Sequence, residues 1–296
     1  MLDRPVPKRF PLLVLPIALS IFGVAQPTLA QVLVPHVPQL NPVRLEEQGL
    51  SLAQESAQLA QFQQYELALV RAQLATQLVP ENPQVWALLG SLYLQVGQDQ
   101  AAIAPLQKAQ SLDREEPAIF FALGTAYFRL KQYDQSIDAL RTGLRLKPDE
   151  PGALFDLGNA YYMQKRYGDA IASYQKAVDI SDDFWPAINN IGLVLYEQGD
   201  VDGALEQWRA AIAIDGTQSE PQLALAVALY AKGQQEEALT TGTEALRLDN
   251  RYGDLDFLVE NLWGDRLLTQ TRTFLQLPRI RETLTQLRQP EPQPEP

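Results

Sequence analysis

Apolar residues recur along this chain in a pattern that repeats every 34 residues between about residues 49 and 252. Within one unit, positions 4, 7, 8 and 11 share one helix face, and positions 20, 24 and 27 share one face of a second helix, because a helix turns once in about 3.6 residues. Units of this length fill the stretch without insertion. The pattern predicts six helical hairpins, at residues 49–82, 83–116, 117–150, 151–184, 185–218 and 219–252.

Glycine and proline punctuate the units in the same phase. A small residue at position 8 lets the two helices of a hairpin approach closely, and in four units it is glycine: Gly90, Gly124, Gly158 and Gly192. Position 15, where the first helix ends and a positive φ is favoured, is Gly97, Gly199 or Gly233 in three units. Prolines near the start of five units suit the first turn of a helix. Pro105 departs from this rule and predicts a kink inside a second helix.

The repeat resembles the tetratricopeptide repeat, whose preferred residues are Trp, Leu, Gly and Tyr in the first helix and small residues in the second. The second unit has Trp86, Leu89, Gly90 and Tyr93 at these places, and the first unit, with Ser56 for glycine, is the weakest match. The resemblance implies an all-α fold, a right-handed α-solenoid of about six antiparallel hairpins, with a C-terminal helical cap.

The period ends after residue 252, and three shorter helical segments are expected over residues 253–288. Apolar stripes run through residues 255–263 and 267–277, and Pro278 is expected to start the last helix. Such a piece covers the open end of a solenoid. The stretch 261–267 resembles the ending of cyanobacterial-type tetratricopeptide proteins. Residues 289–296 (QPEPQPEP) are expected to form an unfolded tail.

The first thirty residues have the layout of a secretory signal peptide. Arg4, Lys8 and Arg9 precede an apolar run over residues 10–25, and Thr28-Leu29-Ala30 offers a cleavage site before Gln31. We expect export through a Sec-type signal to a periplasm or a thylakoid lumen. An uncleaved membrane anchor is the alternative, although the run is short for a membrane span. Residues 31–44, which contain three prolines, are expected to form a linker.

Composition removes most classes of chemistry. The chain has no cysteine, one histidine (His36, in the linker) and a formal net charge of −12. Disulfides, thiol catalysis and zinc fingers are therefore excluded, and an acidic chain is poorly suited to nucleic acid. No nucleotide-binding or metalloprotease motif is present, and paired carboxylates such as Asp182-Asp183 lie at places expected to be solvated. We expect no enzyme activity, no cofactor and no metal.

The resemblance implies that positions 2, 5, 9, 12 and 13 of each first helix face the concave groove. This set carries the candidate binding residues: Phe121, Thr125, Phe128, Arg129, Phe155, Asn159, Tyr162, Asn189, Tyr196 and Tyr230. A row of exposed aromatics needs a cover, and amides can bind a peptide backbone. A competing interpretation is that the position 12 aromatics only pack on neighbouring helices.

One subtype of the family grips a C-terminal carboxylate with basic residues. Asn159 and Asn190 match two of its places, but Phe155, Glu220 and Ala224 occupy the basic ones. The predicted function is a scaffold or assembly factor that holds a partner protein or peptide, neutral to basic and with apolar side chains, in the groove of units three to six. A self-associating structural protein that uses the cap around Trp263 is the alternative.

Overall fold

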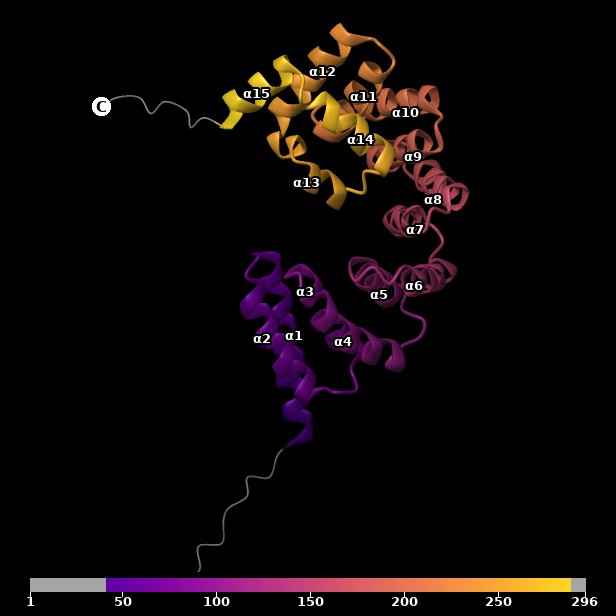
Figure 1. The fold of residues 1–296 in the computed structure, drawn as a ribbon. Helices are drawn as coiled ribbons and strands as arrows, with labels where there is room; N and C mark the ends of the chain where they lie inside the picture. Colours follow the sequence, from indigo (N-terminus) through magenta and orange to yellow (C-terminus); the bar gives the residue numbers. More distant parts are fainter. Residues whose placement is uncertain (1–40, 289–296) are drawn as a thin grey trace, which may run out of the picture. The chain divides into compact units, whose positions relative to one another are not determined.

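The computed structural model describes residues 41–288, and all regular structure in this range is helical (Figure 1). Twelve helices form six consecutive hairpins: α1 (Pro42–Gln61), α2 (Tyr65–Leu78), α3 (Pro83–Gln95), α4 (Asp99–Leu112), α5 (Pro117–Arg129), α6 (Tyr133–Leu146), α7 (Pro151–Met163), α8 (Tyr167–Ile180), α9 (Trp185–Gln198), α10 (Val201–Ile214), α11 (Ser219–Ala231) and α12 (Gln235–Leu248). Each second helix also packs on the first helix of the next hairpin. The predicted all-α solenoid with a C-terminal helical cap is confirmed.

The first helix begins earlier than the sequence pattern indicates. Asn41 caps it, since its side-chain oxygen accepts from the backbone N–H groups of Val43 and Arg44 at 3.0 and 3.3 Å. Pro42 fits the first helical position because its missing N–H would have no helical partner. The linker predicted to reach residue 44 therefore ends before Pro42. The predicted signal segment, the remainder of the linker and the tail from residue 289 lie outside the described residues.

A residue with positive φ follows each of the six first helices: it is glycine after α3, α9 and α11 and another residue type after α1, α5 and α7. Gln63, Lys131 and Lys165 have φ of 58–59°, at the same position where Gly97, Gly199 and Gly233 have φ of 71–93°. The turn geometry is thus common to all six hairpins. The residue type at this position differs between hairpins, but the packing of the two helices imposes the same positive φ.

Inside each hairpin, position 8 of the first helix meets position 24 of the second, and their sizes are complementary. A Cβ atom added to Gly90, Gly124, Gly158 or Gly192 would lie 2.4–2.6 Å from the side chain 16 residues further on. Those partners are Leu106, Leu140, Tyr174 and Trp208. The first unit reverses the sizes, with Ser56 opposite Ala72, so its departure from the repeat pattern is compensated. Pro105 lies buried within α4, which spans residues 99–112 as a single helix.

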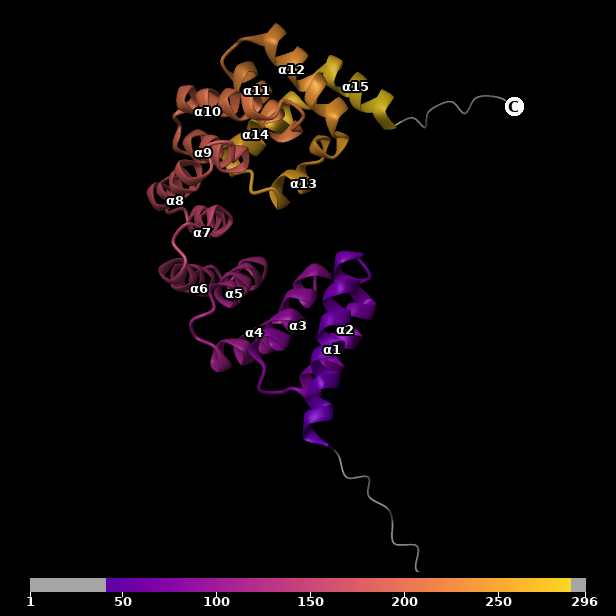
Figure 2. The ribbon, with the colours of Figure 1, turned by 180° about the vertical axis from the view of Figure 1, so that it is seen from behind.

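The last helices fold back onto the final hairpins. After η1 (Asn250–Gly253) come α13 (Leu255–Glu260), α14 (Asp265–Phe274) and α15 (Pro278–Arg288). Helix α14 packs on α9 and α11, and α15 packs on α12, as Figures 1 and 2 show. In the sixth unit position 8 is Ala226 and position 24 is Gly242, and the ring of Phe274 from α14 fills the space beside them. Among the helices of residues 41–288, none combines the length and the apolar character that a membrane span needs.

Candidate partner-binding surface

We call the side of the first helices that carries positions 2, 5, 9, 12 and 13 the first-helix face. At position 9, its exposure falls from α3 to α11. At position 9, Ser91 of α3 is exposed and Thr125 of α5 is half-buried, whereas Asn159 of α7 is 7% exposed. The next two residues in this row, Leu193 and Val227, are each 1% exposed. At this position the face is therefore open on α3 and α5 and closed on α9 and α11.

The segment from α13 to α14 closes it. Trp263, between these two helices, is 4% exposed and its indole Nε1 donates to Oε1 of Glu220 on α11 at 3.0 Å. The guanidinium of Arg266 lies 5.3 Å from the ring centroid of Tyr196, and Phe274 meets Tyr230 edge-on at 5.7 Å. We call residues 255–274 the covering segment.

Glu197 fixes the start of α14 on this face. Its two carboxylate oxygens accept from the backbone N–H groups of Arg266 and Leu267, at 3.1 and 3.0 Å. These N–H groups have no partner within their own helix, and the positive end of the helix dipole favours a carboxylate there. A residue of the fifth unit thus caps a helix about 70 residues later in the chain.

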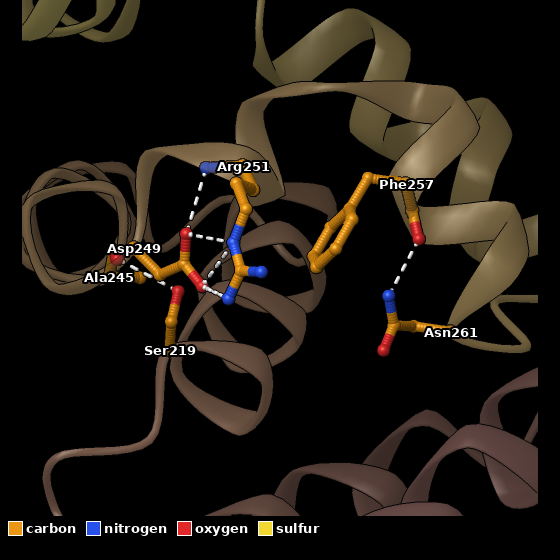
Figure 3. A network of polar contacts seen from close by, with 6 residues as sticks. All are labelled: Ser219, Ala245, Asp249, Arg251, Phe257 and Asn261. Atoms are coloured by element: carbon orange, nitrogen blue, oxygen red, sulfur yellow. Dashed lines mark hydrogen bonds and ion pairs between the residues drawn. The ribbon is translucent and has the colours of Figure 1, made fainter. Parts of the chain in front are cut away.

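A second set of contacts holds the entry to the covering segment (Figure 3). Asp249 pairs with Arg251, whose Nη2 lies 2.6 Å from Oδ2, and this ion pair keeps the pKa of Asp249 below its usual value. The Arg251 guanidinium stacks 4.9 Å from the ring centroid of Phe257, and Asn261 donates to the Phe257 carbonyl at 2.7 Å. Ser219 bonds to the carbonyl of Ala245 at 2.8 Å, which ties α11 to the end of α12.

The amides expected to bind a ligand are instead bonded to one another. Oδ1 of Asn159 accepts from the hydroxyl of Tyr174 at 2.7 Å and from Nδ2 of Asn190 at 2.9 Å. Asn189, which is fully buried, donates to Oδ1 of Asn190 at 3.1 Å. Buried polar groups are usually hydrogen-bonded, and here Oδ1 of Asn189 is the exception, since it has no partner among the described residues. The chain of amides crosses from α7 to α9 beneath the surface.

Glu220 extends this polar chain to the covering segment. Burial raises the pKa of its carboxyl to about 7, while hydrogen bonds from Trp263 and Asn189 act in the opposite direction. The carboxyl therefore titrates near neutral pH while it holds the indole of Trp263. In the sequence, Glu220 is notable only because it stands where the carboxylate-binding subtype of the family has a basic residue. Its position in the mostly apolar helix α11 is the feature that could have indicated burial.

The position 12 aromatics pack against rings of neighbouring elements. Phe128 lies 5.6 Å from Tyr133, and Tyr162, which is 7% exposed, lies 5.9 Å from Tyr167 between ring centroids. Tyr196 is 2% exposed and lies 5.8 Å from Trp208. Only Phe128 and Tyr230 of this row are more than marginally accessible. In this conformation Tyr162 and Tyr196 act as core residues.

The remaining candidates sit on the open part of the face. Phe121 and Phe155 are half-buried; Phe121 packs over Gly143, and Phe155 packs against Tyr174 and Phe184 with ring centroids 5.7 and 5.6 Å away. These two rings line the floor between successive hairpins. Only part of each ring, of Phe121 and of Phe155, is therefore accessible to a partner.

Thr125 and Arg129 supply the polar part of the open face. The hydroxyl of Thr125 lies 3.1 Å from Oδ2 of Asp156 on α7, and Nη1 of Arg129 donates to the Leu94 carbonyl of α3 at 2.8 Å. Burial raises the pKa of Asp156, against the lowering effects of Thr125 and Arg129. These bonds join α3, α5 and α7 across the face, and the sequence did not single out Asp156.

A pocket of about 250 Å³ lies where the open part meets the covering segment. Its walls come from α7, α9 and residues 259–268, and they are mostly apolar with Glu197, Asp265 and Lys165 among them. Met163 and Val259 line it and are 37% and 55% exposed. An apolar side chain from outside the chain fits such a site. Within residues 41–288, no cluster of three or more His, Cys, Asp or Glu is arranged to bind a metal ion.

Family models of the tetratricopeptide repeat match residues 83–116 and 121–183, and a TPR repeat model matches residues 192–233. The chain carries tetratricopeptide repeats. The matched stretches correspond to α3–α4, α5–α8 and most of α9–α11, while α1–α2 and the covering segment lie outside them. No curated protein matches the sequence.

Solved structures with these repeats share the fold. A crystal structure of MamA protein is 24% identical, covers 57% of this chain and 93% of that protein, and has a TM-score of 0.53. YrrB, described as a TPR protein with an unusual peptide-binding site, is 20% identical over 64% of this chain and 97% of its own, with a TM-score of 0.50. The pilF protein of Pseudomonas aeruginosa is 17% identical over 74% of this chain and 99% of its own, with a TM-score of 0.61. Identities this low show the fold alone.

Proposed function

We propose that the protein is an interaction scaffold that holds a partner protein on the open part of the first-helix face, over α3 and α5 and beside Met163 at the end of α7. The observation that carries this proposal is the fall in exposure along position 9, because it leaves one stretch of the face uncovered by the chain itself. The repeats support binding of a peptide or protein, as does the peptide-binding site of YrrB, which has the same fold.

The pocket beside Met163 is the proposed anchor for an apolar side chain of the partner. Its lining residues Glu197 and Asp265, together with the net charge of −12, favour a partner that is neutral to basic. The same charge disfavours nucleic acid. The polar residues of α3 and α5 then face the remainder of the bound segment. We assign no catalytic role to the chain, and we propose that it acts after export, directed by the segment at residues 1–30.

A photo-crosslinking residue in place of Met163 tests the proposal in the cells that make the protein. The matched control carries the same residue in place of Ile214, which is 40% exposed at the end of α10. We expect a partner protein to be captured from position 163 and not from position 214. The partner should be lost when Met163→Glu is combined with a crosslinker at Ser91. Equal capture from both positions contradicts the proposal.

Self-association through Trp263, the alternative raised by the sequence, loses its support. The indole of Trp263 is buried, and its N–H group already donates to Glu220. It therefore cannot anchor a second molecule without leaving α11. The apolar pattern of residues 255–263 predicts that Trp263 belongs to the C-terminal cap, as the structure has it, but its side chain points toward α11 and not toward solvent.

A further inference from the structure

The outer face of α2 carries large apolar side chains that nothing in the described chain covers. Leu67, Val70 and Leu74 are 58%, 53% and 41% exposed, and Phe62, just before α2, is 75% exposed. Their spacing of three and four residues puts Leu67, Val70 and Leu74 in one stripe along the helix. Helix α2 packs on α1 and α3 with its other sides.

The other five units provide an internal control for this stripe. A residue 34, 68, 102, 136 or 170 positions later occupies the same place in each hairpin, and at all these places the side chain is polar or no larger than alanine. Leu67 corresponds to Ala101, Gln135, Asp169, Gly203 and Glu237; Val70 to Ala104, Asp138, Ala172, Glu206 and Thr240; Leu74 to Lys108, Thr142, Lys176, Ala210 and Glu244. The stripe is therefore a property of the first hairpin and not of the repeat.

We propose that this stripe is where two copies of the chain dimerise, with their α2 helices antiparallel about a two-fold axis beside Val70. Leu67 and Leu74 lie three and four residues from Val70, so an antiparallel pair places Leu67 of each copy opposite Leu74 of the other. A two-fold contact requires such a self-complementary surface. Phe62 then extends the contact beyond each end of the stripe.

Charge on α2 does not oppose a second copy as the occupant. The chain has a net charge of −12, so most contacts between two copies bring like charges together. Helix α2 is an exception, because its own two charges, Glu66 and Arg71, sum to zero. Arg71 also pairs with Glu55 of α1 at 3.4 Å, so the helix together with Glu55 carries a net charge of −1. The remaining polar residues beside the stripe are the neutral Gln63, Gln73 and Gln77.

The size of the stripe sets the expected strength. Four apolar side chains with these exposures present roughly 400 Å² per copy, so a dimer buries roughly 800 Å² of apolar surface. Specific interfaces usually bury more than about 1,200 Å² in total, so the contact lies at the weak end. We therefore expect weak dimerisation, which concentrations between about 1 and 100 µM can detect.

Sedimentation velocity of a chain starting at Gln31 tests the proposal, because residues 41–288 pack as a compact unit without the segment before them. We expect the sedimentation coefficient to rise from the monomer to the dimer value between about 1 and 100 µM. Leu74→Glu should keep the chain monomeric throughout. The control is Leu146→Glu, since Leu146 has the same residue type and the same 41% exposure as Leu74.

A single cysteine gives an independent readout, because the chain has none of its own. Val70→Cys should form a disulfide-linked dimer under mild oxidation, and Leu248→Cys, on α12 and 46% exposed, should not. The proposal is overturned by a sedimentation coefficient that is independent of concentration, or by equal disulfide yields from the two cysteines. Neither Leu74 nor Val70 touches the first-helix face on α5 and α7, so partner capture from position 163 is judged separately.

Discussion

At the scale of the residue, the close fit between Gly158 and the ring of Tyr174 shows how little room each hairpin leaves. An added Cβ would lie 2.4 Å from Cε1 of Tyr174, which is fully buried. Relief requires the whole ring to move, and that ring also holds Asn159 by its hydroxyl. One methyl group at this place therefore disturbs both packing and a buried hydrogen bond.

We predict that Gly158→Ala lowers the free energy of unfolding by about 2 kcal/mol, as overpacked cores do. Gly152→Ala is the control, because it lies in the same helix with nothing within 4 Å of the added Cβ. That variant should leave the free energy of unfolding unchanged or raise it by up to about 1 kcal/mol. Urea denaturation measures both. Equal losses in the two variants would show that glycine is needed for another reason.

The half-buried carboxyl of Glu220 makes stability depend on pH near neutrality. Its pKa is about 7 in the folded chain and that of an ordinary glutamate, 4.5, when unfolded. Between these values the folded state binds more protons, so the free energy of unfolding rises as the pH falls from about 7 to 4.5. Above pH 7 the carboxylate is charged in the folded chain as well, so the full free-energy cost of its desolvation lowers the stability.

We predict that Glu220→Gln removes this dependence. The amide oxygen can still accept from the Trp263 indole, but the side chain carries no charge. Relative to the wild type, the variant should gain up to about 3 kcal/mol of unfolding free energy at pH 8 and almost nothing at pH 4. Urea denaturation at the two pH values gives the difference. A gain of equal size at both pH values would exclude titration of Glu220 as its source.

At the scale of the element, the covering segment completes the sixth hairpin. Four hairpins fill the space between their helices with a large side chain from position 24, but the sixth has Gly242 there and takes Phe274 from α14 in its place. The segment thus provides part of the core of the unit on which it lies. It is a structural member of the solenoid end.

We predict that Phe274→Ala lowers the free energy of unfolding by about 3–5 kcal/mol, because it empties a fully buried site. Hydrogen exchange should become faster in α9 and α11, which contact α14, and stay unchanged in α3 and α5. Phe257→Ala, which removes a half-exposed ring stacked by Arg251, should cost only about 1 kcal/mol. Uniform acceleration of exchange across all helices would contradict a local role for Phe274.

At the scale of the whole molecule, the 34-residue period accounts for what the sequence could predict. Each hairpin repeats the same contacts between near neighbours, so Gly90 and Leu106 are enough to define the fold of their unit. Even the weakest unit follows, because Ser56 and Ala72 exchange sizes. Contacts between residues close in sequence that recur in six units can be predicted from the sequence alone.

The covering segment could not be predicted in the same way. Its contacts join Glu197 to Arg266 and Glu220 to Trp263, and each occurs once, between residues 43 or more positions apart. The expected site residues were placed by unit position alone, which treats all first helices as equally exposed. Asn189 and Tyr196 are buried because of what lies over them, and no property of their own units signals it. The isolated carboxylates of Glu197 and Glu220, in mostly apolar helices, were the one feature of the sequence that could have indicated a covering element.

The order of synthesis gives the covering segment one more consequence. The chain is made from its N-terminus, so α9 and α11 are complete before the residues that cover them exist. A product that stops before Trp263 lacks part of the cluster in which Leu193, Tyr196 and Val227 are buried, so the apolar surface around them is more exposed than in the chain described above. Bare apolar surface is what chaperones bind and proteases attack. Synthesis must therefore pass the covering segment before the chain can hide this surface.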